Sequence, residues 1–197
     1  MGRPKKLSDD ECLEQAFDVI SREGFESFTL EQVGRAVGLS PAALIKRFGT
    51  KDRLARAARD RKWDVNLEQV AAAQSDSLRG LASLSHFVKL IARSVDSKRL
   101  GEHMRLLGSQ SDEPRSRKRV AAYFRGTRER VALCLREAVE DEELRPIDVE
   151  RVAFSLEALI QGAIFQFGFL ERRGIENHLH EHVQTFLEPY RKAIVGG

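Results

Sequence analysis

The chain has 197 residues, of which 42% are hydrophobic and 32% charged, a composition typical of a soluble globular protein and not of a disordered or fibrous one. Basic and acidic residues nearly cancel, at 33 against 30, so the total charge does not indicate a polyanionic partner. The longest uncharged stretch, residues 158–170, has 13 residues, whereas a membrane-spanning helix needs about 20. The basic N-terminal residues are followed by acidic ones instead of an apolar stretch, so we expect no secretory signal and a cytoplasmic protein.

Apolar residues recur at helical spacing along nearly the whole chain, and no alternating run favours a strand. The sequence therefore predicts an all-α protein with about nine helices. Four residues that can cap a helix N-terminus, Ser8, Thr29, Ser40 and Thr50, open four successive helices. Longer helices are expected at 77–95, 98–107, 115–140, 148–172 and 176–194.

The charges are sorted along the first third of the chain. Residues 1–8 hold three basic and no acidic residues, residues 9–31 hold one basic and eight acidic, and residues 32–63 hold nine basic and two acidic. This pattern favours a polyanion contacted by the basic arm and the third helix, with the acidic face of the first helix turned away. Charges that merely solvate the surface are the alternative.

Residues 29–48 have the pattern of a helix-turn-helix, in which the second helix enters the major groove of DNA. Gly34 is small where the two helices must approach closely, and Gly38 can adopt the positive φ of the turn. The outward positions of the second helix are Pro41, Ala42, Ile45, Lys46 and Arg47. A helical hairpin without a nucleic-acid role is the alternative.

Residues 29–54, TLEQVGRAVGLSPAALIKRFGTKDRL, resemble the DNA-binding signature of the TetR family of bacterial transcriptional regulators. The match extends over about residues 9–56, and the length and the helical remainder of the chain also fit. The resemblance implies a helix-turn-helix DNA-binding domain with a basic arm at residues 1–54 and a helical ligand-binding and dimerisation domain at residues 55–197.

The resemblance also assigns roles to individual residues. Those expected to touch phosphates are Thr29, Ser40 and Lys51, and those expected to face bases or their sugar-phosphate rims are Ala42, Ala43, Ile45, Lys46 and Arg47. Family members often carry an aromatic residue at position 45 and a histidine at position 47. Ile45 could read only a thymine methyl or a sugar surface, whereas Arg47 could grip a phosphate or a guanine edge. The arm, with Arg3 and Lys5, would lie in a minor groove or remain a disordered terminus.

One helix-turn-helix reads too few base pairs for useful specificity, so we expect a homodimer on a palindromic operator, with half-sites about 34–36 Å apart. By resemblance, two helices near the C-terminus form the dimer surface. The candidate interface residues are Val120, Val131, Leu135, Ala158, Gly162 and Phe169, for which core packing within one subunit is the alternative.

By the same resemblance, this domain encloses a small-molecule pocket. The candidate lining residues are Trp63, Phe87, His103, Met104, Phe124, Phe154 and Phe165, although such residues on a helix face are more often plain core. The scarcity of charges in residues 152–170 favours an apolar or aromatic effector.

Few residues indicate metal binding, thiol chemistry or catalysis. His178 and His182 lie four apart on a helix and could share a zinc ion, but no third ligand is near in sequence, so no metal or cofactor is predicted. Cys12 and Cys134 are expected to be reduced core thiols. No catalytic motif is present, so we expect a sequence-specific DNA-binding transcriptional regulator, a repressor released by a small-molecule effector, and not an enzyme. The alternative is a helical enzyme or a small-molecule or lipid-binding protein with an incidental basic surface.

Overall fold

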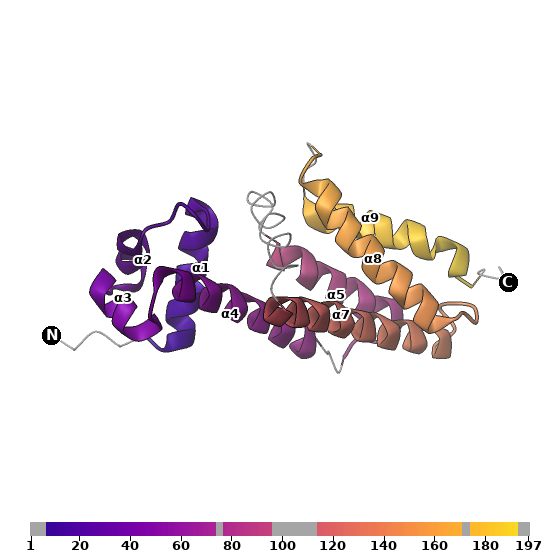
Figure 1. Ribbon diagram of the computed structural model, residues 1–197. Coiled ribbons are helices and arrows are strands. Elements are labelled where there is room, and N and C mark those ends of the chain that lie inside the picture. Colours follow the sequence, from indigo (N-terminus) through magenta and orange to yellow (C-terminus); the bar gives the residue numbers. More distant parts are fainter. Residues whose placement is uncertain (1–6, 74–76, 96–113, 171–173, 193–197) are drawn as a thin grey trace. The chain divides into compact units, whose positions relative to one another are not determined.

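The computed structural model describes residues 7–73, 77–95, 114–170 and 174–192. In these ranges the backbone forms helices joined by turns, with an isolated bridge between Leu144 and Arg191 (Figure 1). The prediction of an all-α protein is confirmed, and the helix expected at 98–107 lies outside the described residues. None of the described helices has the length and apolar character needed to cross a membrane.

The chain divides into two units, which are described separately. The first unit holds α1 (Asp9–Glu23), α2 (Leu30–Val37), α3 (Pro41–Phe48), α4 (Lys51–Ala72) up to residue 66, and residues 114–119 of α7 (Pro114–Glu140). The second unit holds the rest of α4 and α7 together with α5 (Gly80–Ser94), α8 (Val149–Phe167), α9 (Ile175–Leu187) and a short 3-10 turn at Glu188–Tyr190. The domain boundary expected after residue 54 falls inside α4, which runs on as one continuous helix.

The first helices begin where their caps require. The Glu11 amide donates to the Ser8 hydroxyl at 3.2 Å, while the Ser8 amide donates to the Glu11 carboxylate at 2.8 Å. This reciprocal pair satisfies two backbone donors that the first turn of α1 cannot use internally. Gly24, with φ +93°, follows the last residue of α1 and ends it.

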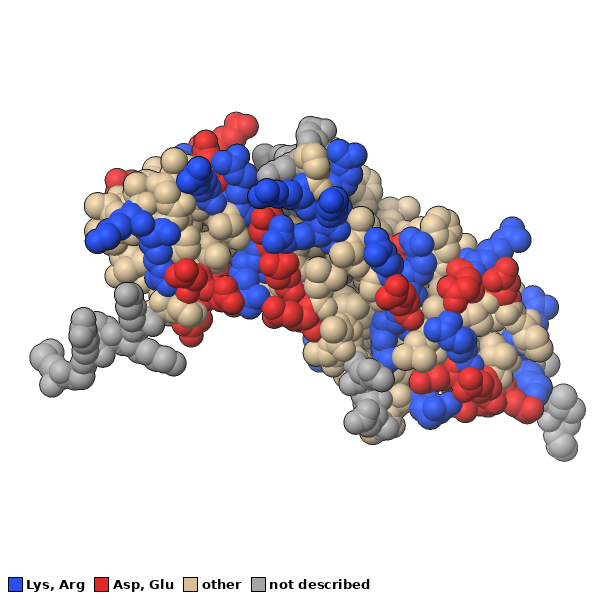
Figure 2. All heavy atoms as spheres, turned by 60° about the horizontal axis from the view of Figure 1, so that its bottom comes forward, with Lys and Arg blue, Asp and Glu red and all other residues tan. Residues whose placement is uncertain are grey.

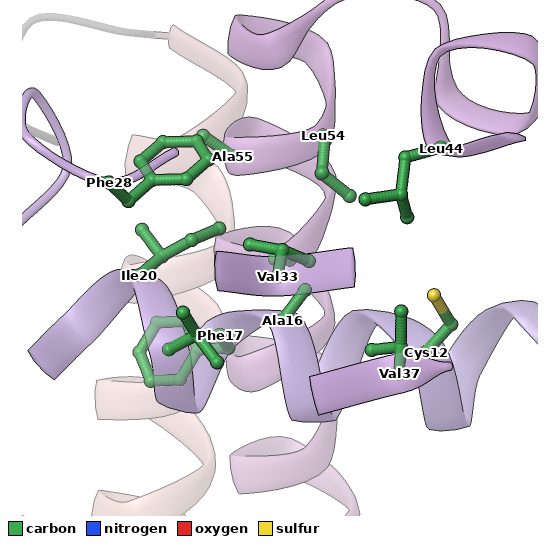
Figure 3. Close-up of a cluster of buried hydrophobic side chains, with 12 residues drawn as sticks. Cys12, Ala16, Phe17, Ile20, Phe28, Val33, Val37, Leu44, Leu54 and Ala55 are labelled. Atoms are coloured by element: carbon green, nitrogen blue, oxygen red, sulfur yellow. The ribbon is translucent and has the colours of Figure 1, made fainter. Parts of the chain in front are cut away.

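A cluster of buried apolar side chains holds the first unit together (Figure 3). Its members come from α1, α2, α3, α4 and the segment between α1 and α2: Cys12, Ala16, Phe17, Val19, Ile20, Phe28, Val33, Val37, Leu44, Leu54, Ala55 and Ala58. Full burial of a leucine or isoleucine contributes roughly 1.5–3 kcal/mol. Helices as short as α2 and α3 would be unstable alone, so this cluster is what fixes their mutual position.

The core of the second unit is built mainly by α5, α7, α8 and α9, with α9 packed against both α5 and α8. Fully buried side chains on α7, α8 and α9 include Cys134, Leu135, Leu156, Ile160 and Leu179.

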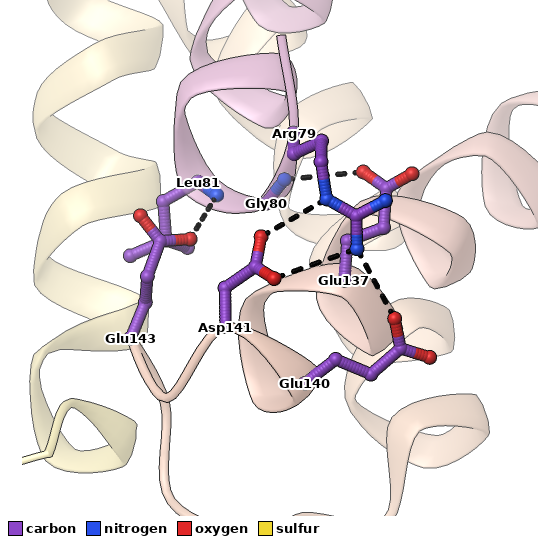
Figure 4. A network of polar contacts seen from close by, with 7 residues as sticks. All are labelled: Arg79, Gly80, Leu81, Glu137, Glu140, Asp141 and Glu143. Atoms are coloured by element: carbon purple, nitrogen blue, oxygen red, sulfur yellow. Dashed lines mark hydrogen bonds and ion pairs between the residues drawn. The ribbon is translucent and has the colours of Figure 1, made fainter.

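The N-terminus of α5 is held by carboxylates from the end of α7 and the turn that follows it (Figure 4). The Gly80 amide donates to Glu137 at 3.1 Å, and the Leu81 amide donates to Glu143 at 2.7 Å. Arg79, which makes no side-chain cap of its own, pairs with Glu140 and Asp141, each at 3.2 Å. Carboxylates here satisfy free N–H groups and favourably meet the positive end of the helix dipole.

Several helices are shorter than predicted. α5 begins at Gly80 instead of 77, α8 ends at Phe167 instead of 172, and α9 ends at Leu187 instead of 194. Gly168 follows α8, and Pro189, which lacks a backbone N–H, follows α9. Both residue types terminate helices readily.

Candidate nucleic-acid interface

The turn between α2 and α3 has the geometry of a helix-turn-helix. Gly38 adopts the left-handed conformation, with φ +69° and ψ +29°. A Cβ atom at Gly34 would lie 2.4 Å from the Leu39 carbonyl oxygen, so the two chain segments meet at a distance that only glycine permits. Leu44 on α3 is fully buried and thereby sets the rotation of α3 about its axis.

That rotation leaves one face of α3 open to solvent. Ala42, Ile45 and Lys46 are exposed, while Ala43 is half-buried. The exposed residues combine an apolar surface with one cation, and an ammonium group can donate to a guanine edge or a phosphate. The exposed face of α3 therefore has the shape and chemistry of a recognition helix.

The three residues expected at phosphates lie at helix N-termini. The hydroxyl oxygens of Thr29 and Ser40 accept hydrogen bonds from the Gln32 and Ala43 amides at 3.2 and 3.1 Å. Each hydroxyl keeps its proton to donate outward. Lys51 lies at the start of α4, where its Nζ donates to the Glu26 carbonyl at 3.2 Å and stands 4.5 Å from the centre of the Phe28 ring. An ammonium has three donors, so it can hold this place and still bind a phosphate.

Arg47 was expected at an outward position of α3, but its side chain does not point outward. Its guanidinium turns back towards α1 and donates to the Asp9 carboxylate and, at 2.9 Å, to the Leu7 carbonyl. Arg3 and Lys5 of the expected basic arm lie outside the described residues.

Acidic residues of α1 pair with basic residues of the segment that follows. Asp9 pairs with Arg47, and Glu14 pairs at 2.9 Å with Arg61 of α4. Burial lowers the pKa of Lys62, against the opposing effect of Asp18 and Glu14. Figure 2 shows Lys and Arg side chains interspersed with Asp and Glu over the visible face. Part of the excess charge counted in residues 32–63 is therefore neutralised within the first unit.

The side chains expected around an effector divide into three groups. Trp63 and Phe87 are buried and Phe124 is half-buried. Phe154 and Phe165 are exposed on α8, because they lie on the face of that helix opposite its buried residues. They therefore do not belong to the core of the second unit as the structure describes it, and His103 and Met104 lie outside the described residues.

Polar side chains buried in the second unit were missed by the sequence analysis. Tyr123 is buried on α7, and burial raises its pKa, while hydrogen bonds with Gln161 and Thr127 lower it. Arg130 donates to the Ser83 hydroxyl at 2.7 Å. The spacing of residues 123, 127 and 130, which lie on one face of a helix, was the signal that could have revealed them.

Glu157 is a buried charged residue on α8. It lies 3.7 Å from Arg128, and its pKa is raised by burial against the opposing effect of that arginine. The expectation of an apolar effector depended on a scarcity of buried charge in residues 152–170. Glu157 lies inside this stretch and is a buried charge, so the stretch is not purely apolar.

The expected dimer residues also divide. Ala158, Gly162 and Phe169 are exposed, and nothing lies within 4 Å of a Cβ placed at Gly162. Val131 and Leu135 are fully buried in the core of their own unit. They face inward from α7 and cannot contact a second subunit, so their assignment to the interface is wrong. Val120 is half-buried.

His178 is buried, with its Nε2 3.1 Å from the Ala163 carbonyl oxygen and its ring 4.6 Å from that of His182. The described residues contain no group of three potential metal ligands around these histidines or elsewhere. Cys12 and Cys134 are free and buried in different units.

Comparison with known proteins identifies the family. The model described as "Bacterial regulatory proteins, tetR family" matches residues 13–58, and the model described as "Tetracyclin repressor-like, C-terminal domain" matches residues 108–186. No curated protein matches the chain.

Solved structures share the fold over almost the whole length. A transcriptional regulator from Saccharomonospora viridis in complex with choline has a TM-score of 0.75 and 20% identity, covering 92% of this chain and 96% of its own. The TetR family regulator PfmR from Thermus thermophilus has a TM-score of 0.63 and 24% identity, covering 89% and 96%. The SmeT–triclosan complex has a TM-score of 0.65 and 18% identity, covering 94% and 92%. With one family model for the helix-turn-helix and another for the helical remainder, the chain belongs to the TetR family of DNA-binding bacterial transcriptional regulators.

Proposed function

We propose that this protein is a homodimeric repressor that binds a palindromic operator and releases it when a small molecule binds in the second unit. The observation that carries the proposal is the exposed face of α3. Ala42, Ile45 and Lys46 are exposed on a helix that the buried Leu44 holds in one orientation. In this proposal α3 enters a major groove, and these residues read bases or their rims together with Ala43.

The phosphate contacts are proposed for Thr29, Ser40 and Lys51. Their positions at the N-termini of α2, α3 and α4 support this role, because free backbone N–H groups and the positive end of the helix dipole attract anions there. We propose that Arg3 and Lys5 extend the contact into the adjacent minor groove.

Dimerisation is proposed through the exposed apolar stripe of α8. Phe154, Phe165 and Phe169 are 56%, 48% and 75% exposed. Phe154 and Phe165 share one face of α8 with the exposed Ala158 and Gly162, and Phe169 lies in the turn that follows the helix. The rings of Phe165 and Phe169 are 5.1 Å apart and form one surface. A large exposed apolar patch marks an interaction site, and small residues at its centre allow a second helix to approach closely.

The effector is proposed to be a small molecule bound in the second unit. Regulators with the same fold bind choline and triclosan, which supports a ligand of this size. The buried Tyr123, Arg130 and Glu157 offer hydrogen bonds and charges, which favours an effector with polar groups. Because α4 passes from the first unit into the second, it could couple the two sites with a free energy of about 1–3 kcal/mol.

Selection of bound fragments from random duplex DNA tests the proposal. We expect a palindromic consensus with half-sites about one helical turn apart. Lys46→Ala should change the selected bases. Lys51→Ala should weaken binding to all sequences alike and reduce the slope of log affinity against log salt by about 0.9. Lys89→Ala, an exposed lysine on α5, is the matched control and should leave both properties unchanged.

A helical enzyme or lipid-binding protein with an incidental basic surface predicts a different result. No sequence would then be enriched, and duplex binding would not exceed the non-specific level. That outcome would overturn the proposed function.

A further inference from the structure

Five residues of α3 are expected at bases or their rims. Within the part of the chain that the structure describes, Arg47 is the one whose side chain is held by other groups of the protein. It lies in the last turn of α3, and its side chain is 19% exposed. Its Nε donates to the Asp9 carboxylate and its Nη2 donates to the Leu7 carbonyl at 2.9 Å. The guanidinium carbon lies 5.4 Å from the centre of the neighbouring Phe48 ring. Three different groups therefore fix the orientation of this guanidinium.

Moving Arg47 towards DNA would be unfavourable for two reasons. It would break a charge-assisted hydrogen bond, which is about twice as strong as a neutral one. It would also leave the exposed carboxylate of Asp9 without its counter-charge beside a polyanion, where like charges repel. Lys46, the adjacent residue, is exposed on the same helix. It can reach DNA without breaking this hydrogen bond and without leaving Asp9 unpaired.

Leu7 connects the contacts of Arg47 to the basic arm. It directly follows the basic segment Arg3-Pro4-Lys5-Lys6, and its carbonyl is the group that Arg47 binds. Asp9, the other partner, is the first residue of α1. Arg47 thus ties the beginning of α1, and the point where the arm joins it, to the end of the recognition helix α3.

We propose that Arg47 is a positioning residue that holds the origin of the basic arm beside α3, and that it does not itself read a base. The proposal rests on the proposed function, since it concerns how the same DNA-binding surface is assembled. Arg47 then contributes to DNA binding through Asp9 and Leu7, and its loss acts on the arm instead of on a base pair.

Operator affinity of four full-length variants tests the coupling to Asp9. We expect Arg47→Ala and Asp9→Ala each to weaken binding roughly tenfold, the effect of one hydrogen bond to a charged group. The double variant should be no weaker than Arg47→Ala, because Arg47→Ala already removes the contact with Asp9. Asp10→Ala, which removes the same charge from the same turn of α1, is the matched control and should not weaken binding. If Asp9→Ala binds as well as the wild type or better, Asp9 is merely a competitor of DNA for Arg47 and the proposal is wrong.

Two further measurements separate positioning of the arm from base reading and from a general loss of stability. Bases selected from random DNA by Arg47→Ala should match those of the wild type, whereas a change at one base pair would identify Arg47 as a base contact and overturn the proposal. Replacing Arg3 and Lys5 by alanine should weaken binding by the wild type more than binding by Arg47→Ala. An equal loss in both backgrounds would show that Arg47 does not position the arm.

Failure of this inference can be told apart from failure of the proposed function. If Lys46→Ala and Lys51→Ala alter operator binding as expected while Asp9→Ala does not weaken it, only the role of Arg47 is wrong. If the wild type enriches no sequence at all, the proposed function fails first.

Discussion

Gly34 sets the closest approach between α2 and the turn that leads into α3. Replacing it with alanine would place a Cβ 2.4 Å from the Leu39 carbonyl oxygen, and backbone cannot give way as a flexible side chain can. We expect Gly34→Ala to lower the free energy of unfolding by about 1–3 kcal/mol, the range for an overpacked site, as measured by urea denaturation.

Gly126→Ala is the matched control for this prediction. Gly126 lies within α7, and its added Cβ would meet only Val70 at 3.5 Å, an ordinary contact. Alanine should there stabilise the helix by up to about 1 kcal/mol. Equal effects of the two substitutions would contradict the steric role assigned to Gly34.

Glu157 should make stability depend on pH. Burial raises its pKa in the folded protein, so the folded state holds the proton more tightly than the unfolded chain. The free energy of unfolding therefore falls as the pH rises above roughly 4.3, where an unperturbed glutamate titrates. Glu157→Gln should remove this decline, as measured by urea denaturation of both proteins between pH 4 and 8. Glu150→Gln, an exposed glutamate at the start of the same helix, should leave it, and parallel curves for the wild type and Glu157→Gln would contradict the prediction.

Residues with local partners could be predicted from the sequence, and residues with distant partners could not. The capping pairs Ser8 with Glu11 and Thr29 with Gln32 span three residues each, so the pattern alone identifies them. Arg47 finds Asp9 across 38 residues. No spacing rule brings those two positions together, because their contact exists only once the core has assembled.

At the scale of one helix, α5 depends on side chains that belong to another part of the chain. Glu143→Ala should lower the free energy of unfolding by about 1 kcal/mol, the usual cost of losing a helix N-terminal cap, because the Leu81 amide would lose its 2.7 Å acceptor. Glu140→Ala is the matched control, since Glu140 only pairs with the exposed Arg79, and such pairs contribute little. Thermal and urea unfolding measure both, and a larger loss for Glu140→Ala would refute the capping role.

The same helix shows why element boundaries were harder to predict than element types. The apolar period of α5 is visible in the sequence and predicts the correct helix. Its first residue is set by Glu137 and Glu143, which lie more than 50 positions away, so no local start signal existed at Gly80. The early ends of α8 and α9, by contrast, follow from the local terminators Gly168 and Pro189. The prediction extended both helices past these residues because the apolar period continues beyond them.

For the whole molecule, the exposed apolar stripe of α8 predicts that operator binding requires dimerisation. Gly162→Glu would place a charge at the centre of the proposed dimer surface, and burying an unpaired charge is strongly unfavourable. We expect a monomer by analytical ultracentrifugation and a large loss of operator affinity, because a single α3 reads only half of the site. Ala82→Glu, an exposed position on α5, adds the same charge and should leave the dimer intact. A Gly162→Glu variant that remains dimeric would place the interface elsewhere.

The two buried thiols make the unfolding of each unit separately observable. Cys12 lies in the first unit and Cys134 in the second, and burial raises the pKa of both. Only the thiolate reacts with alkylating reagents, so each cysteine becomes reactive when its own unit opens. Mass spectrometry of the alkylated peptides would then report whether an effector protects the second unit alone or both units together, without any label being introduced.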